Sequence, residues 1–322
     1  MDTLRCGVTG GDEPVDDRQL SPDDAFGVLG NETRIRILRE LGDAGEPLSF
    51  TDLRNRVSIR QGAQFNYHLD KLVGHFVEKT DEGYALGKPG RRVVEAVLSG
   101  AVTEDPLLEP ARVDFDCRLC GAPVELGFSH ERVEFYCTEC PGHYARSEKT
   151  RPSIADGDRG ILGGFSLPAA GVRDRSPDEV LRTASLWGHL ETLAAANGVC
   201  PRCSAIVDHS IRVCEDHAAD VEDLCKTCDR RHAVQVRRRC TNCIYESEGM
   251  AVNQLISSPE LRCFVADHGI EPLANGVEWG WAYDEEVRSV EPFEAAFTFE
   301  FDGDAITLTV EDELDVVEVT HQ

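Results

Sequence analysis

The chain has 322 residues, with 59 acidic and 33 basic side chains and a formal net charge of −26. This length favours two or three domains and excludes a single small module held together by disulfides alone. No stretch approaches the ~20 consecutive apolar residues that a membrane-crossing helix requires. The first residues also lack the basic and apolar regions of a secretory signal. We therefore expect a cytoplasmic protein with no membrane partner.

The basic residues are an unusual mixture, because only five of the 33 are lysines. An acidic, lysine-poor composition resembles that of proteins from extreme halophiles. Molar salt shortens the Debye length to about 3 Å and screens acidic repulsion. The net charge therefore indicates habitat more than partner, and its distribution along the chain is more informative.

The N-terminal third reads as a tail followed by helices. Residues 1–20 are polar and acidic without periodicity, which predicts a disordered tail. Ser21 has the properties of a helix N-cap, and residues 31–41 place aliphatic side chains on one face of a second helix. Residues 49–52, Ser-Phe-Thr-Asp, match a capping box ahead of a further short helix.

The next helix carries a single apolar stripe. Phe65, Leu69, Leu72 and Phe76 follow at spacings of 4, 3 and 4. The opposite side combines amide, phenol and cationic groups, which are the types that reach base edges and phosphates in a major groove. We expect the following residues of this helix, its preceding turn and the next strand to contact DNA: Arg60, Gln61, Gln64, Asn66, Tyr67, Lys71 and Lys79. His68, near the edge of the stripe, is expected to pack or to form a hydrogen bond rather than to read a base.

Two short strands around Asp81–Gly83 then predict a wing, and a helix over 91–98 closes the module. The segments NETRIRILREL, SFTDL, FNYHLDKLVGHFV and EGYAL resemble the ArsR-type winged-helix regulators. In that family the pattern S-x-H-L-x-x-L marks the recognition helix, and residues 66–72 here read N-Y-H-L-D-K-L. Arg60-Gln61-Gly62 provides no good N-cap for this helix, and the N-terminal cysteine pairs of metal-sensing members are absent.

The resemblance covers roughly residues 25–98. It implies a winged helix-turn-helix fold, a DNA-binding transcription regulator, and a homodimer whose two recognition helices read successive major grooves. It also implies that Gln64, Asn66, Tyr67 and Lys71 face the DNA. Metal-triggered release from DNA is not expected.

Charge supports DNA binding independently of the resemblance. Residues 31–92 contain 11 basic and nine acidic residues, a local charge of +2, so the other 260 residues carry −28. This is the one long stretch that escapes the acidic bias, as a nucleic-acid-binding module would. The alternative is a winged helix that mediates protein contacts only.

Cysteines in an intracellular chain are more often metal ligands than disulfide partners. Of the 13 cysteines here, 11 lie in or near C-x-x-C pairs. Cys117, Cys120, Cys137 and Cys140 have the spacing of a zinc ribbon over residues 113–146. An iron-sulfur cluster and a redox disulfide pair are the alternatives for these thiols. His143 is a further possible ligand, ranked below Cys140.

A second module offers eight ligands for two sites: Cys200, Cys203, Cys214, His217, Cys225, Cys228, Cys240 and Cys243. We expect sequential pairing, with one site formed by the first four and one by the last four, although crossed pairing of the first C-x-x-C with the third stays open. With the zinc ribbon, the chain would hold about three structural zinc ions in closed sites. The isolated Cys6 and Cys263 are expected to be a tail thiol and a small core residue.

Residues 225–243 also carry six basic residues against one acid. This cluster is expected either to touch nucleic acid or to pair with the acidic residues of 281–322. A helix is expected over 177–196 and another near 258–268. A hairpin of 295–301 with 305–310, followed by a strand over 315–319, ends the chain.

The sequence therefore predicts an α+β protein: a winged helix-turn-helix domain (21–100), a zinc ribbon (113–146), a loop and helix connector (147–198), and a zinc-ribbon pair plus a small antiparallel β-sheet (199–322). It carries no Gly-rich phosphate loop or nucleophile elbow, so we expect a regulator and not an enzyme. A protein or small-molecule effector could act on the C-terminal domain. The alternatives are a zinc-ribbon protein acting on RNA or the transcription machinery, and a zinc-thiolate redox sensor.

Overall fold

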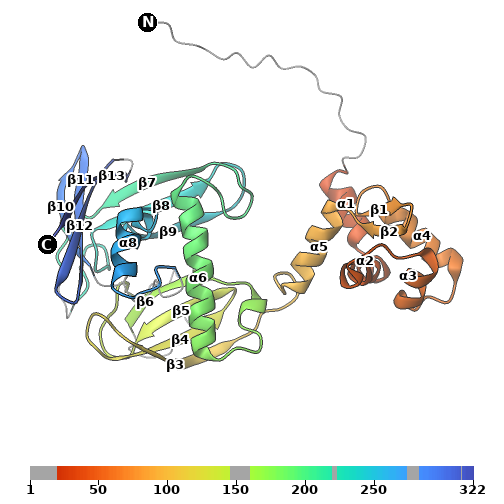
Figure 1. Cartoon of the computed structure of the whole chain (residues 1–322), viewed down its shortest axis with the longest axis horizontal. Coiled ribbons are helices and arrows are strands. Elements are labelled where there is room, and N and C mark those ends of the chain that lie inside the picture. Colours follow the sequence, from red (N-terminus) through yellow and green to blue (C-terminus); the bar gives the residue numbers. More distant parts are fainter. Residues whose placement is uncertain (1–19, 146–159, 220–222, 274–282, 313) are drawn as a thin grey trace, which may run out of the picture. The chain divides into compact units, whose positions relative to one another are not determined.

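The computed structural model describes residues 20–145, 160–219, 223–273, 283–312 and 314–322 (Figure 1). The chain divides after Thr103 into two compact units, which are described separately. The α+β class expected from the sequence is confirmed. Nearly all of the expected tail, and Cys6 within it, lies outside the described residues. In the part of the chain that the structure describes, no helix is both long and apolar enough to cross a membrane.

The first unit contains five helices and one hairpin in its described residues. In chain order these are α1 (Pro22–Leu29), α2 (Glu32–Ala44), α3 (Phe50–Val57), α4 (Gly62–Leu72), β1 (Val77–Thr80), β2 (Gly83–Leu86) and α5 (Lys88–Leu98). The caps form as expected: the Ser21 and Ser49 hydroxyls accept the backbone N–H groups of Asp24 and Asp52. Gln61 makes no side-chain cap for α4, also as expected.

The core of this unit forms along the apolar stripe of α4. Phe65, Leu69 and Leu72 are fully buried against side chains of α2 and α3. Phe76 is also buried in this core, but it lies beyond the end of α4 and not on the helix as expected. The rings of Phe50 and Phe65 meet edge to face, with centroids 5.0 Å apart. Burial of these aliphatic and aromatic side chains contributes roughly 1.5–3 kcal/mol each to the stability of the unit.

The second unit begins with an antiparallel sheet. Its strands β3 (Leu108–Asp116), β4 (Pro123–Ser129), β5 (Arg132–Cys137) and β6 (Gly160–Ser166) lie in chain order. A one-turn 3₁₀ helix, η1 (Ala169–Gly171), and the long helix α6 (Pro177–Ala196) follow, and α6 packs against β3 and β6 (Figure 1). The expectation that the connector of residues 147–198 contains only loop and helix is wrong at β6. Its glycines hide the strand pattern, whereas pairing with β5 fixes the extended backbone.

Two more antiparallel sheets complete the unit. One contains β7 (Val207–Val213), β8 (Val234–Cys240) and β9 (Glu246–Met250). The other contains β10 (Asp284–Val290), β11 (Phe293–Phe301), β12 (Asp304–Glu311) and β13 (Val316–His321). The short helices α7 (Val252–Leu255) and α8 (Pro259–Asp267) lie between them in the chain. Strand β10 was not expected from the sequence, because its residues DEEVRSV are mostly charged.

Helix α6 approaches the first sheet closely at a glycine. A Cβ atom on Gly188 would lie 2.1–2.7 Å from side-chain carbons of Phe165, and the Phe165 ring also contacts Phe135, with centroids 5.9 Å apart. Since close-packed interiors accommodate added atoms poorly, this glycine sets the distance between helix and sheet.

We expect Gly188→Ala to destabilise the second unit by about 1–3 kcal/mol, because the methyl group must displace Phe165. All three tryptophans of the chain lie in residues 104–322, so denaturant unfolding followed by tryptophan fluorescence reports this unit. Leu186→Ala, on the exposed face of the same helix, is the control and should cost less. Equal losses for the two variants would contradict the close approach.

The C-terminal sheet is joined to β8 through a partly buried carboxylate. Glu285 Oε1 accepts the backbone N–H groups of Ala233 and Val234, at 2.6 and 3.2 Å. Tyr283 stacks on His232 beside it, with ring centroids 4.0 Å apart. Burial raises the pKa of Glu285 to about 7, while the two N–H groups act in the opposite direction.

This raised pKa predicts a pH dependence of stability. The pKa lies above that of the unfolded chain, so the contribution of Glu285 is fully present below the unfolded pKa of about 4.5 and is lost as the pH rises through about 7. Between pH 5.5 and 7.5 we expect thermal stability to fall less with rising pH in Glu285→Gln than in the wild type. Glu286→Gln, at the exposed neighbouring position, should behave as the wild type; parallel curves for all three proteins would refute the assignment.

Candidate metal centres

Eleven cysteines and one histidine of the second unit assemble into three groups of four. The groups are Cys117, Cys120, Cys137 and Cys140; Cys200, Cys203, Cys240 and Cys243; and Cys214, His217, Cys225 and Cys228. In each group all four candidate ligand atoms lie within 4.8 Å of one another. We call them tetrad 1, tetrad 2 and tetrad 3. Each could hold a metal ion.

The same turn follows one C-x-x-C pair in each tetrad. After Cys117-x-x-Cys120, the N–H of Gly121 donates to the Cys117 carbonyl at 2.7 Å, and Gly121 has a positive φ of 75°. Ser204 and Asp229 repeat this bond to Cys200 and Cys225, at 2.8 and 2.7 Å, with positive φ as well. The left-handed residue reverses the chain directly behind two cysteines, so that both sulfurs point to one centre.

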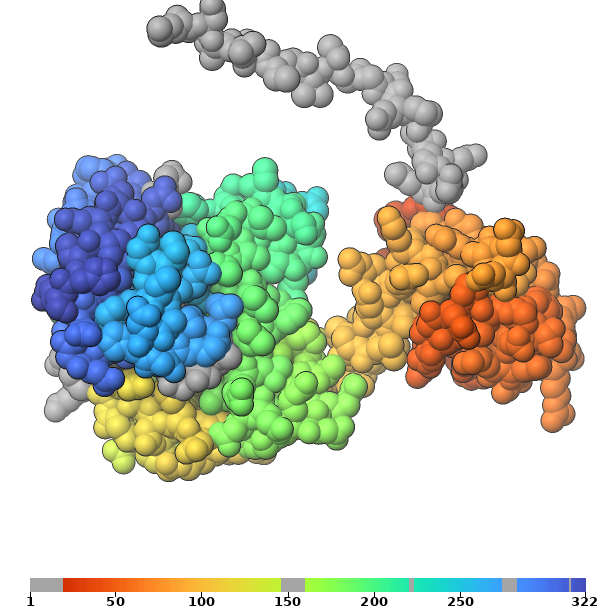
Figure 2. Space-filling model, viewed as in Figure 1, coloured from red at the N-terminus to blue at the C-terminus, as the bar shows by residue number. Residues whose placement is uncertain are grey.

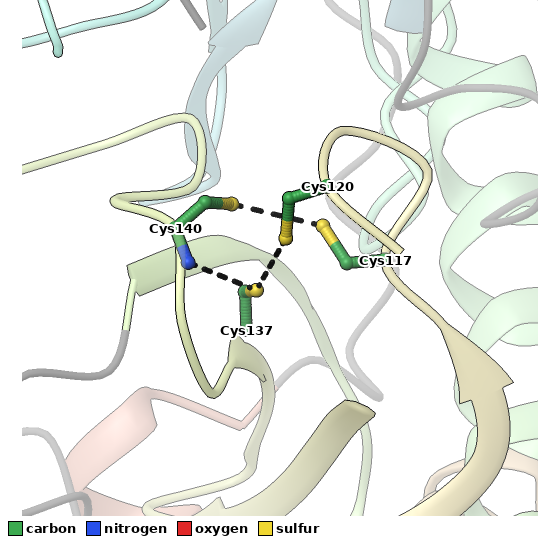
Figure 3. A group of neighbouring side chains, drawn as sticks. All are labelled: Cys117, Cys120, Cys137 and Cys140. Atoms are coloured by element: carbon green, nitrogen blue, oxygen red, sulfur yellow. Dashed lines mark hydrogen bonds between the residues drawn. The ribbon is translucent and has the colours of Figure 1, made fainter. Parts of the chain in front are cut away.

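Tetrad 1 is shown in Figure 3. The Sγ atoms of Cys117 and Cys140 are 3.7 Å apart, and those of Cys120 and Cys137 are 3.5 Å apart. A tetrahedral ion with bonds of ~2.3 Å to sulfur requires ligand separations of about 3.8 Å, whereas a disulfide requires about 2.05 Å. The geometry therefore fits a metal ion and not a disulfide.

The second module pairs its ligands in a nested order. Tetrad 2 joins the first C-x-x-C pair to the last, with Cys203 and Cys240 Sγ 3.5 Å apart. Tetrad 3 is formed by the two middle pairs and lies inside this loop of the sequence. The expected sequential pairing is wrong, and so is the crossed alternative of first pair with third. Strand pairing explains the result, because the β7–β8 register places Val207 beside Cys240 and thereby brings the outermost pairs together.

The histidine of tetrad 3 has the environment of a metal ligand. His217 Nδ1 faces Cys228 Sγ at 3.5 Å, while Nε2 lies 3.0 Å from the carbonyl oxygen of Arg231. Since a carbonyl can only accept, Nε2 carries the proton and Nδ1 presents its lone pair to the centre of the tetrad. A backbone carbonyl that orients an imidazole in this way is typical of metal sites.

The electrostatics of the tetrads also favour a bound cation. Burial raises the pKa of Cys117 to about 11 and that of Cys228 to about 12. In contrast, the backbone N–H of Ala218 helps to lower the pKa of Cys225 to about 6. Three or four sulfurs this close cannot all be thiolates without a positive charge among them, and a divalent ion would remove this conflict.

Tetrad 1 contains Cys140, which the sequence analysis ranked above His143 as a ligand. His143 is buried and stacks on His232, with ring centroids 5.3 Å apart. Cys263 is exposed on α8, and its assignment to the core is therefore wrong. Helical periodicity alone could not separate this position from the buried neighbour Phe264. Asn242 was not among the expected site residues, and its amide approaches Cys203 Sγ at 3.7 Å.

Most of the arginines of residues 225–243 have partners within the second unit. Arg230 binds Glu248 at 2.6 Å, Arg237 forms an ion pair with Glu246, and the guanidinium of Arg238 is buried against the Gln254 oxygen at 2.8 Å. These acids belong to β9, not to residues 281–322 as one expectation held. The alternating glutamates of ESEGM indicated these ion pairs in the sequence. They could be matched to the arginines only once the β8–β9 register was known.

The residues expected to contact DNA all lie at the surface of the first unit. Arg60, Gln61, Gln64, Asn66, Tyr67, Lys71 and Lys79 are each exposed. Most belong to α4, while Lys79 lies on β1. His68 is half-buried, with its ring against Tyr67 at a centroid distance of 5.3 Å.

Double substitutions distinguish nested from sequential pairing by counting bound metal. We expect Cys200→Ser with Cys243→Ser to lose one ion per chain, because both belong to tetrad 2, and Cys203→Ser with Cys214→Ser to lose two. Sequential pairing predicts the reverse order. The check is elemental analysis of the purified full-length variants beside the wild type.

Two family models match the chain. Residues 22–97 match the domain of unknown function DUF7347, and residues 114–316 match the domain of unknown function DUF7351. Among curated proteins, an adenylate kinase from Enterococcus faecalis is 29% identical over 139 residues, which are 41% of this chain and 64% of that protein. The chain thus spans 64% of the length of this relative. No solved structure matches the chain. Since the second family match extends over more than half of its length, the chain belongs to the DUF7351 family.

Proposed function

We propose that the protein is a sequence-specific DNA-binding transcription regulator that uses a winged helix in its first unit. The observation that carries this proposal is the exposed polar face of α4. The apolar stripe of this helix is fully buried, while its other side leaves Gln64, Tyr67 and Lys71 in solvent. A folded helix with this division of faces can enter a major groove without unfolding any of the core.

The side chains on this face suit a nucleic-acid contact. Tyr67 remains 58% exposed, and the Lys71 ammonium lies 5.9 Å from the centre of its ring. Asn66 donates an amide hydrogen to Asp70 at 2.6 Å, which leaves its carbonyl oxygen as an acceptor. A cation for phosphate, a ring for apolar contact and amides for base edges are thus presented together.

The hairpin that follows supports the same proposal. Strands β1 and β2 pair over four residues each, and Lys79 lies on the outer part of β1 with its ammonium 6.0 Å from the Tyr84 ring. The order of helices and hairpin in this unit is the one that the resemblance to ArsR-type regulators implies. We propose a homodimer on the same basis, with the exposed Phe26 of α1 as an available apolar contact.

We further propose that zinc occupies the three tetrads and serves to hold the second unit together. Four protein ligands fill a tetrahedral zinc ion and leave no position for a substrate, so the proposal assigns no catalysis to these sites. The partial similarity to an adenylate kinase does not change this assignment. A phosphate-binding loop of the form G-x-x-x-x-G-K-[ST] does not occur in the sequence, and the nearest pattern, at residues 83–89, is one residue short and continues with Pro89.

The two other functions have less support. A nucleic-acid contact through the arginines of residues 225–243 would have to compete with the ion pairs of Arg237 to Glu246 and of Arg230 to Glu248. A redox sensor would release zinc under mild peroxide with a coupled change in DNA affinity. An effector that acts on the second unit is part of the regulator proposal.

DNA binding is tested with variants of the α4 face. We expect Lys71→Ala to weaken binding to a duplex selected from genomic fragments and to reduce the slope of log K against log salt by about one, through loss of a phosphate contact. Tyr67→Ala and Gln64→Ala should weaken binding to the selected duplexes more than binding to duplexes of unrelated sequence. Fluorescence anisotropy at several salt concentrations measures these effects, and light scattering gives the number of chains per duplex.

Arg182→Ala provides the control, because Arg182 is an exposed cation on α6 in the second unit and should leave binding unchanged. Undiminished binding by the three α4 variants, each folded as judged by thermal unfolding, would remove the basis of the proposal.

A further inference from the structure

A pocket of about 640 Å³ lies between α8 and the edge of the C-terminal sheet. Figure 2 shows the light-blue segment that contains α8 beside the dark-blue C-terminal strands. Helix α8 contributes residues at helical spacings of three and four, and the sheet contributes the ends of β12 and β13. The lining residues of a type that can bind metals are Glu260, Cys263, Asp267, His268, Asp304 and His321. None of these belongs to the three tetrads.

The tautomer of His268 is fixed by its backbone contact. Its Nδ1 lies 2.8 Å from the carbonyl oxygen of Phe264, and because this oxygen can only accept, Nδ1 carries a proton. In the neutral imidazole Nε2 therefore has a lone pair. This is the arrangement of ligating histidines, which donate one ring N–H to a carbonyl and bind the metal with the other nitrogen.

The lone pair of Nε2 faces another acceptor. Asp304 Oδ2 lies 3.4 Å from His268 Nε2. A lone pair and a carboxylate oxygen at this separation repel each other unless a cation lies between them. A proton on Nε2 is one such cation and a metal ion bound to both groups is another.

We propose that His268 and Asp304 are the preformed half of a fourth metal site, which binds a zinc-class divalent transition-metal ion in this pocket. Imidazole, thiolate and carboxylate together are the donors that such ions prefer. The site differs from the tetrads in being open. His268 is 12% exposed and Asp304 is 74% exposed, so the ion would exchange readily and keep water among its ligands.

The remaining donors come from side chains that can rotate into place. Cys263 is exposed one turn before Asp267 on the pocket face of α8, and His321 is exposed on β13 with its ring 6.3 Å from that of Phe264. Rotation of exposed side chains takes little free energy compared with a metal–ligand bond. The affinity is therefore expected to be lower than that of a preassembled tetrad.

The experiment is calorimetric titration of Zn²⁺ into the full-length protein that already holds its complement of structural metal. We expect one further equivalent per chain. His268→Ala and Asp304→Asn should each weaken this binding at least about tenfold, and Cys263→Ser or His321→Ala should also weaken it by several fold. Asp304 is exposed, so its variant keeps the test valid if His268→Ala is unstable.

The matched control is His130→Ala. His130 Nε2 and Asp105 Oδ2 form a second exposed His–Asp pair, 3.9 Å apart, that does not line the pocket. Its substitution should leave the additional equivalent unchanged. Absence of this equivalent in the wild type, equal loss in the control, or binding that neither Cys263→Ser nor His321→Ala affects would each overturn the assignment, leaving a proton to bridge His268 and Asp304.

Discussion

The second unit depends on a demand that its cysteines place on the backbone: four ligand atoms must meet within 4.8 Å at three separate points. The turns behind Cys117, Cys200 and Cys225 satisfy this demand locally, by reversing the chain over a left-handed residue. The sheets satisfy it at longer range, since strand register decides which two turns face each other. A metal ion bound there would stabilise only the strand register that completes the set of four ligands. The tetrads would then favour one strand pairing among several that apolar side chains alone would permit.

The first unit is specified in another way, through helix caps and one apolar stripe. Ser21, Ser49 and the spacing of Phe65, Leu69 and Leu72 are local signals, and the structure confirms each of them. These signals succeed because capping and helical periodicity involve residues within a few positions of each other. The same locality identified all twelve ligands of the tetrads from their C-x-x-C and C-x-x-H spacing.

Pairing across long distances could not be predicted in the same way. The nested order of the tetrads follows from the β7–β8 register, and no sequence spacing distinguishes it from the sequential order. The glycines of strand β6 obscure its strand pattern. Arg230 and Arg237 find their partners Glu248 and Glu246 only once β9 is aligned with β8. Cys263 is a single residue that could not be placed from the sequence. It adjoins the apolar Phe264 on α8, and the spacing alone does not show which of the two faces solvent.

Nesting has a consequence for how the chain reaches this structure. His217 and Cys228 of tetrad 3 are 11 positions apart, whereas Cys203 and Cys240 of tetrad 2 are 37 apart. Closing the longer segment first would cost about 1 kcal/mol more conformational entropy than closing the shorter one. An ion bound at the inner site would shorten the segment that the outer site has to span. Metal uptake in this region should therefore proceed from the inside outward, with the inner ion acting as a template for the outer one.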